Sequence, residues 1–166
     1  APTMINTAGA GFVRPFFPKN TMTDYPIRRL KISDYDKLIA LWQRCDLSHR
    51  PEGRDTFEGI AKEFERPETC FYVMLDGDKM IGSVVGSSDG RKGWINRLAV
   101  DPDYRRQGLS GRLIEECENF LYKLGLKIIA ALIEGENIES LATFKKAEYE
   151  LWNHITYCSK RFSPED

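Results

Sequence analysis

The chain has 166 residues, enough for one domain with a sizeable hydrophobic core. Its 24 basic and 25 acidic side chains give a formal net charge of −1, which argues against nucleic-acid binding, since that usually needs a net basic face. No apolar run approaches the roughly 20 residues of a membrane span, and residues 1–20 lack the charged and apolar regions of a secretory signal. We therefore expect a cytoplasmic protein that binds neither nucleic acid nor a membrane.

The cysteine and histidine pattern argues against a metal site. The sequence has two histidines, His49 and His154, and no two cysteines form a CxxC pair. Each cysteine lies in a segment with apolar periodicity, so we expect all of them to be reduced core residues. They are Cys45, Cys70, Cys117 and Cys158.

Residues 1–22 differ in composition from the rest of the chain. They are rich in Gly, Pro, Thr and Ala, and apolar periodicity begins only after Met22. One interpretation is a disordered extension or a remnant of an expression vector. The other is an arm whose phenylalanines, within residues 12–18, dock on this domain or on a neighbouring copy. Residues 23–166 are expected to form a single domain, because they contain no internal repeat and no linker.

The first half of this domain predicts one strand and two helices. Residues 27–30 form the expected strand. Ser33 is the expected N-cap of a helix whose apolar residues recur at i, i+3, i+4 and i+7 as far as Cys45. Asp55, with an acid three residues later, predicts the start of the second helix, and Pro67 ends it.

The second half alternates β-prone runs with helical periodicity. The β-prone runs are 70–75, 80–86, 94–100, 128–133 and 149–158, and a turn signal at 76–78 joins the first two into an antiparallel hairpin. Helical periodicity covers 109–124 and about 136–146, and Gly125 is the expected C′ residue of the longer helix. The element order is therefore β-α-α-β-β-β-α-β-α-β, which indicates an α/β (α+β) fold.

The segment between the strand at 94–100 and the following helix has the features of an anion site. A strand that turns directly into a helix leaves backbone N–H groups unpaired, and the helix dipole adds partial positive charge there. Gly108 allows close approach of an anion, and Arg105 and Arg106 add charge that complements phosphate. An ordinary polar turn is the alternative. The loop lacks the Gly-Lys-Ser/Thr of a Walker motif and the third glycine of a dinucleotide fingerprint.

Residues 98–113 resemble motif A of the GNAT acyl-CoA N-acyltransferases. That motif runs from a hydrophobic-Ala-Val strand end through Arg/Gln-x-x-Gly-x-Gly/Ala into a helix, and it is matched by Arg105, Gly108 and, in place of the last Gly/Ala, Ser110. Residues 39–47 resemble the first helix of small stand-alone bacterial members of the YpeA type, and the resemblance extends over about residues 26–162. It implies a mixed, mostly antiparallel sheet with a splayed parallel strand pair, flanked by helices.

The resemblance implies that acetyl-CoA is a cosubstrate and that no metal is required. Its pantetheine arm would lie between the strands at 94–100 and 128–133, and loop N–H groups would bind the pyrophosphate. The residues assigned to acetyl-CoA in this way are Leu98, Ala99, Val100, Arg105, Arg106, Gln107, Gly108, Leu109, Ser110, Gly111, Asn137 and Phe144.

The sequence departs from the family at the catalytic positions. In many members, a tyrosine lies seven residues after the asparagine that corresponds to Asn137, and it is the acid that protonates the CoA thiolate. This chain has Phe144 at that position. A glutamate that often serves as a base near the end of the fourth strand is replaced by Asn96 or Arg97. Glu134 and Tyr149 are weak candidates for these roles, and a solvated helix-start acid and a packing aromatic are their respective alternatives.

The resulting hypothesis is an N-acetyltransferase that moves an acetyl group to a primary amine by direct attack in a ternary complex. The alternatives are a GNAT-like sensor that binds acyl-CoA with little catalysis, and a nucleotide-binding protein. The acceptor, whether a small metabolite, a peptide N-terminus or a protein lysine, stays open, as does the choice between monomer and homodimer. Acceptor specificity often resides in the loop after the first helix, which here contains His49 and Arg50.

Overall fold

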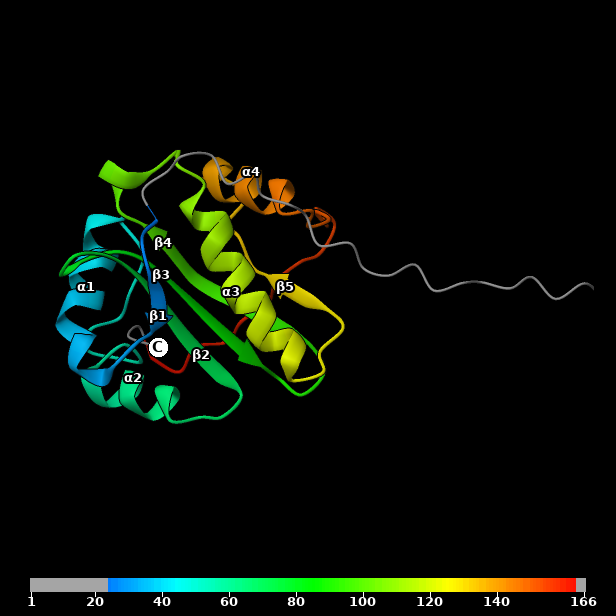
Figure 1. Ribbon diagram of the computed structural model, residues 1–166. Helices are drawn as coiled ribbons and strands as arrows, with labels where there is room; N and C mark the ends of the chain where they lie inside the picture. Colours follow the sequence, from blue (N-terminus) through cyan, green and yellow to red (C-terminus); the bar gives the residue numbers. More distant parts are fainter. Residues whose placement is uncertain (1–23, 164–166) are drawn as a thin grey trace, which may run out of the picture.

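The computed structural model of the protein describes residues 24–163, and the expectations about residues 1–22 lie outside the described residues. Within this part of the chain a sheet has the strand order β1-β2-β3-β4-β5, with helices on both of its faces (Figure 1). The strands are β1 Ile27–Arg29, β2 Thr69–Asp76, β3 Lys79–Ser88, β4 Gly93–Val100 and β5 Ile129–Ala131. The α-helices are α1 Tyr35–Arg44, α2 Phe57–Phe64, α3 Leu109–Lys123 and α4 Ile138–Lys146, and short 3₁₀ turns cover η1 Ile32–Asp34 and η2 Pro102–Tyr104.

The sheet separates two apolar clusters, because side chains alternate between its faces along each strand. One cluster joins β2–β4 to α3 and α4, and the other joins the opposite face to α1 and α2. Gly86 lets α3 approach the sheet closely, since a Cβ there would lie 2.4 Å from Cys117 Sγ. Figure 1 shows α3 lying across the sheet, with α1 on the other side.

The sheet opens into a fork between β4 and β5. All pairs from β1 to β4 are antiparallel, and β4 and β5 are parallel, as the resemblance implied. Their pairing ends at Ile95 and Ala131, so the rest of β4 as far as Val100 has no strand on that side among the described residues. A backbone edge of β4 is therefore left open.

A β-bulge in β4 lies at the start of this fork. The register between β3 and β4 shifts between Ser83 and Val85, and Arg97 on the bulged strand has φ +51°. The bulge breaks the alternation of side chains, so the neighbouring residues Asn96 and Arg97 both line a pocket on the α1 and α2 face. It thus directs two polar side chains to one side of the fork.

Several sequence predictions of elements need correction. Residues 149–158 form no strand but an irregular segment that is exposed except for the half-buried Tyr149, because β-prone side chains need a partner strand and none pairs with them in the described chain. Cys158 is accordingly exposed, not in the core, and Cys45 is only half-buried, whereas Cys70 and Cys117 are buried as expected. Gly125 does follow α3 with φ +85°.

The helix starts also differ from the sequence predictions. Ser33 lies inside η1, and α1 begins after Asp34. The cap of α2 is Thr56, whose hydroxyl accepts from the N–H of Gly59, and not Asp55. In the described residues no helix is both long and apolar enough to span a bilayer, and no trio of His, Cys, Asp or Glu side chains gathers as a metal site would require.

Candidate functional site

The loop that joins β4 to α3 is anchored at its start by Asp101. This carboxylate is almost fully buried and binds Arg44 at 2.9 Å and Lys79 at 3.2 Å. Burial opposes ionisation, but the N–H of Asp103 and the two cations outweigh it and lower the pKa of Asp101 below its ordinary value. The charged pairs fix the point at which the chain leaves the sheet.

Beyond this anchor, the loop exposes backbone donors. Arg106 and Gly108 have φ of +60° and +73°, a left-handed conformation that turns successive N–H groups toward one side. Gly108 is the N-cap of α3 and supplies no side-chain acceptor, and the first turn of the helix contains no acid. By contrast, the side chains of Thr56 and Asn137 cap α2 and α4. The start of α3 is therefore suited to bind an anion from outside the chain.

Arg105 spans the gap between the end of β4 and the start of α4. Its Nε donates to the Val100 carbonyl oxygen at 3.2 Å, and its Nη1 lies 3.3 Å from a Glu139 carboxylate oxygen. The pair with Glu139 is exposed and contributes little to stability. This geometry shows that the Val100 carbonyl points to the open edge of β4, where a ligand amide could replace the guanidinium.

The other predicted cofactor residues fall into two groups. The backbone of the loop and the open edge of β4 lie together at the fork, as expected. The side chain of Leu109 and the whole of Gly111 are buried, so they support the loop from below. Asn137 accepts from the Ser140 N–H at 3.0 Å and caps α4, whereas Phe144 is only 4% exposed and packs in the α3–α4 core.

Neither weak catalytic candidate has an arrangement that suggests proton transfer. Glu134 is an exposed loop residue after β5. The Tyr149 hydroxyl donates to Glu118 of α3 at 2.8 Å, and its ring meets Phe144 edge-on with centroids 5.0 Å apart. Burial and then the Glu118 carboxylate raise the pKa of Tyr149 far above its ordinary value, so its proton is held firmly.

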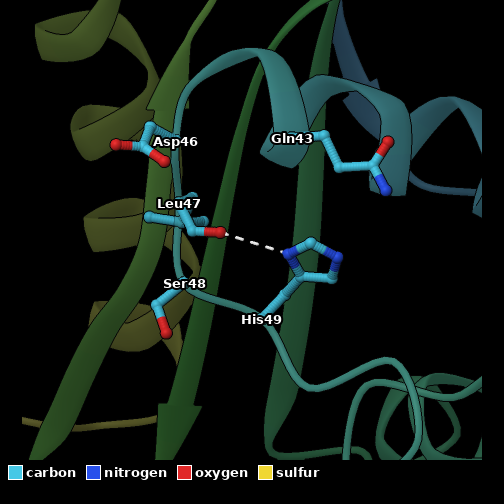
Figure 2. A pocket seen from close by; sticks show the side chains of 5 residues that line it. All are labelled: Gln43, Asp46, Leu47, Ser48 and His49. Atoms are coloured by element: carbon cyan, nitrogen blue, oxygen red, sulfur yellow. Dashed lines mark hydrogen bonds between the residues drawn. The ribbon is translucent and has the colours of Figure 1, made fainter.

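An open pocket of about 400 Å³ lies along the loop after α1 (Figure 2). Gln43, Asp46, Leu47, Ser48 and His49 line it. His49 Nδ1 donates to the Leu47 carbonyl oxygen at 3.3 Å, and Figure 2 shows the Gln43 and His49 side chains on the side of the loop opposite to Asp46. The predicted specificity loop therefore does border a surface hollow.

A second pocket, of about 270 Å³, lies between α2 and the bulge of β4. The Arg97 guanidinium donates to both Asp55 carboxylate oxygens at 2.7 and 2.8 Å and to the Ser48 carbonyl. It also lies 4.7 Å from the centroid of the Trp42 ring. Asp55 further accepts the Arg50 N–H at 2.6 Å. These contacts fasten the loop between α1 and α2 to the bulge.

Sequence reasoning missed this pocket. Asp55 was expected to cap a helix, and its partner Arg97 lies 42 residues away. From the sequence, Asn96 or Arg97 only occupies the position of the missing family base and has no role of its own. The same pocket contains Glu63 of α2, which no motif identifies.

A family model, described as "Acetyltransferase (GNAT) family", matches residues 35–149. This chain belongs to the GNAT acetyltransferase family. An acetyltransferase of Sodalis glossinidius (strain morsitans) is 32% identical over 135 residues, covering 81% of this chain and 94% of the relative. The family resemblance predicted from the sequence is thus confirmed, and the protein is an enzyme of the acetyltransferase class.

Solved GNAT structures share the fold. AAC(6')-Iy, in complex with the bisubstrate analogue CoA-S-monomethyl-acetylneamine, superposes with a TM-score of 0.72 at 16% identity, covering 84% of this chain and 99% of that one. PaiA N-acetyltransferase from Thermoplasma acidophilum, in complex with coenzyme A, gives a TM-score of 0.67 at 18% identity, covering 75% and 88%. At such identities the likeness establishes the GNAT fold and nothing finer.

Proposed function

We propose that this GNAT domain transfers the acetyl group of acetyl-CoA to a primary amine within a ternary complex. The observation that carries the proposal is the open edge of β4 beside an uncapped α3 N-terminus, both at one fork. A pantetheine arm needs backbone partners along an extended path, and a pyrophosphate needs convergent N–H donors. The solved structures of AAC(6')-Iy with a CoA bisubstrate analogue and of PaiA with coenzyme A support the same ligand.

The roles of the residues follow from this placement. The N–H groups from Arg106 to Ser110, with the Arg105 and Arg106 side chains, bind the pyrophosphate. The backbone of Leu98 and Val100 holds the arm, after Arg105 has left the Val100 carbonyl. Acetyl-CoA supplies the activated acetyl thioester, and the chain orients it toward the amine.

The thiolate leaving group receives its proton without a dedicated tyrosine. Phe144 has no hydroxyl, and the Tyr149 hydroxyl is held by Glu118. A thiol of ordinary pKa, about 8.5, is a tolerable leaving group near neutral pH, so water serves as the proton source. The missing acid costs a factor of about 10²–10⁴ in rate at most.

The lack of a tyrosine hydroxyl at Phe144 favours one alternative function, a sensor that binds acyl-CoA without efficient transfer. Thiol release from acetyl-CoA across a panel of primary amines separates the two functions. The transferase proposal expects thiol release that requires an amine, whereas tight acetyl-CoA binding with no thiol release for any amine would favour the sensor. Displacement of acetyl-CoA by ATP would instead indicate nucleotide binding. A cytoplasmic location and the oligomeric state stay predictions.

A further inference from the structure

The pocket beneath the β4 bulge contains a carboxylate that the fold itself does not use. Glu63 follows Ile60 by three residues on α2, so both side chains project from one face of that helix into the pocket. In the described part of the chain, the Glu63 carboxylate makes no hydrogen bond and no ion pair of 4.0 Å or less. The other pocket carboxylate, Asp55, is fully engaged by Arg97 and by the Arg50 N–H.

The pocket lining contains two carboxylates, Asp55 and Glu63, and two guanidinium groups, Arg54 and Arg97, and of the two carboxylates only Glu63 has no ion pair. The Arg97 guanidinium already donates hydrogen bonds to Asp55 and to the Ser48 carbonyl and lies over the Trp42 ring. The other arginine of the lining, Arg54, is exposed. Beneath these polar groups lie the buried side chains of Trp42, Ile60, Phe71 and Val85. An ammonium group in the pocket would give the Glu63 carboxylate the charged partner that it lacks.

The position of the pocket connects it to the fork. Asn96 and Arg97, which line it, directly follow Ile95, the last β4 residue paired with β5. The pocket thus lies on the α1 and α2 face at the point where the open edge of β4 begins. This face of the sheet is the one opposite to α3.

We propose that Glu63 binds the ammonium group of the acceptor in this pocket and removes its proton. The inference rests on the acetyltransferase function proposed above. Glu63 takes one proton from R–NH₃⁺, and the neutral amine forms a C–N bond to the acetyl carbon as the C–S bond breaks. The second proton of the attacking nitrogen passes to water, water protonates the CoA thiolate, and Glu63 returns its own proton to water.

The electrostatic surroundings of Glu63 favour this role. Burial raises the pKa of Glu63 above its ordinary value, and the neighbouring Asp55 carboxylate raises it further. The guanidinium groups of Arg97, Arg66 and Arg54 act in the opposite direction without reversing the shift. A base with a pKa nearer neutrality is a better proton acceptor at physiological pH. Its benefit is largest for an ε-amine, whose pKa of about 10.4 leaves roughly one part in 10³ neutral at pH 7.

The test compares Glu63→Gln with Glu58→Gln, an exposed position on the same helix and outside the pocket. Thiol release by the full chain is measured with acetyl-CoA and two probes, N-acetyl-lysine amide and an alanyl peptide with a free α-amine. We expect Glu63→Gln to lower kcat/KM for N-acetyl-lysine amide by about 10²-fold or more. The loss should be smaller for the alanyl peptide, and the carboxylate limb of the pH profile should disappear. The KM for acetyl-CoA and the urea midpoint should stay unchanged, as all parameters should for Glu58→Gln.

The outcomes separate this proposal from the one on which it rests. If the wild type acetylates either probe and Glu63→Gln does so equally well, Glu63 is not the base, but the transferase function stands. A Glu63→Gln variant that is clearly less stable than the wild type would also overturn the proposal, because the carboxylate would then have a structural role. If the wild type releases thiol with no amine at all, the proposed function itself fails.

Discussion

Replacement of Arg97 by methionine tests whether the ion pair at the β4 bulge holds the loop between α1 and α2. The Arg97 and Asp55 side chains are only 16% and 5% exposed, and their oxygen–nitrogen contact is 2.7 Å. Arg97→Met leaves Asp55 with the Arg50 N–H as its main donor and removes the contacts with Ser48 and Trp42. Loss of one partner from a buried ion pair costs about 3–5 kcal/mol in the free energy of unfolding. Methionine keeps the Cβ, so the strain of φ +51° is unchanged.

Urea unfolding monitored by circular dichroism measures this cost, and a double-mutant cycle assigns it to the pair. We expect Asp55→Asn to restore much of the stability in the Arg97→Met background, because no buried charge then remains. The matched control is Arg66→Met, which removes the exposed pair with Glu68 at 2.6 Å and should leave the urea midpoint nearly unchanged. A loss below about 1 kcal/mol for Arg97→Met, or simple additivity of the two changes, would refute the reasoning.

Three further predictions concern the core, the cofactor loop and pH. Gly86→Ala should destabilise the protein by about 1–3 kcal/mol in urea unfolding, because its Cβ would lie 2.4 Å from Cys117 Sγ; a wild-type midpoint would show that α3 is not packed so closely. Gly108→Ala should raise the KM for acetyl-CoA, because φ is +73° and the added Cβ would point into space open to the ligand. Its control, Gly125→Ala at φ +85° after the same helix, should lose similar stability with an unchanged KM, and equal KM values for both variants would contradict the loop assignment. The hydrogen bond from Arg28 lowers the pKa of Asp34 below its ordinary value. The ionised Asp34 therefore stabilises the folded protein above about pH 4, and this stabilisation is lost as the pH falls through the lowered pKa. Asp34→Asn should therefore weaken the acid dependence of the unfolding free energy, and an unchanged slope between pH 5 and about 2 would count against it.

The fold and the conformation of the loop between β4 and α3 could be predicted from the sequence because their signals are local. Residues 98–113 carry strand, turn and helix in one continuous motif, and Gly108 and Gly125 both adopt the left-handed conformation that glycine favours. The hairpin of β2 and β3 likewise follows from two β-prone runs around a turn.

The pocket that we propose for the acceptor could not be predicted in the same way. Asp55 and Arg97 are brought together by the bulge of β4 and by the packing of α2, neither of which has a sequence signature. Glu63 belongs to an amphipathic helix, and its place in a pocket depends on which residues of β4 face that helix. The prediction of a strand at 149–158 was wrong although its local signal is strong. The β-propensity of this segment is not matched by a partner strand among the described residues.

The most direct test of the account is the stoichiometry of acetyl transfer from labelled acetyl-CoA. The protein is incubated with acetyl-CoA and with each of the two probe amines, and the free thiol and the labelled amine are counted separately. Direct transfer in a ternary complex predicts one acetylated amine for each thiol released, with no labelled protein and no thiol release when the amine is omitted. Label on the protein, or thiol release without acetylated amine, would contradict direct transfer within a ternary complex.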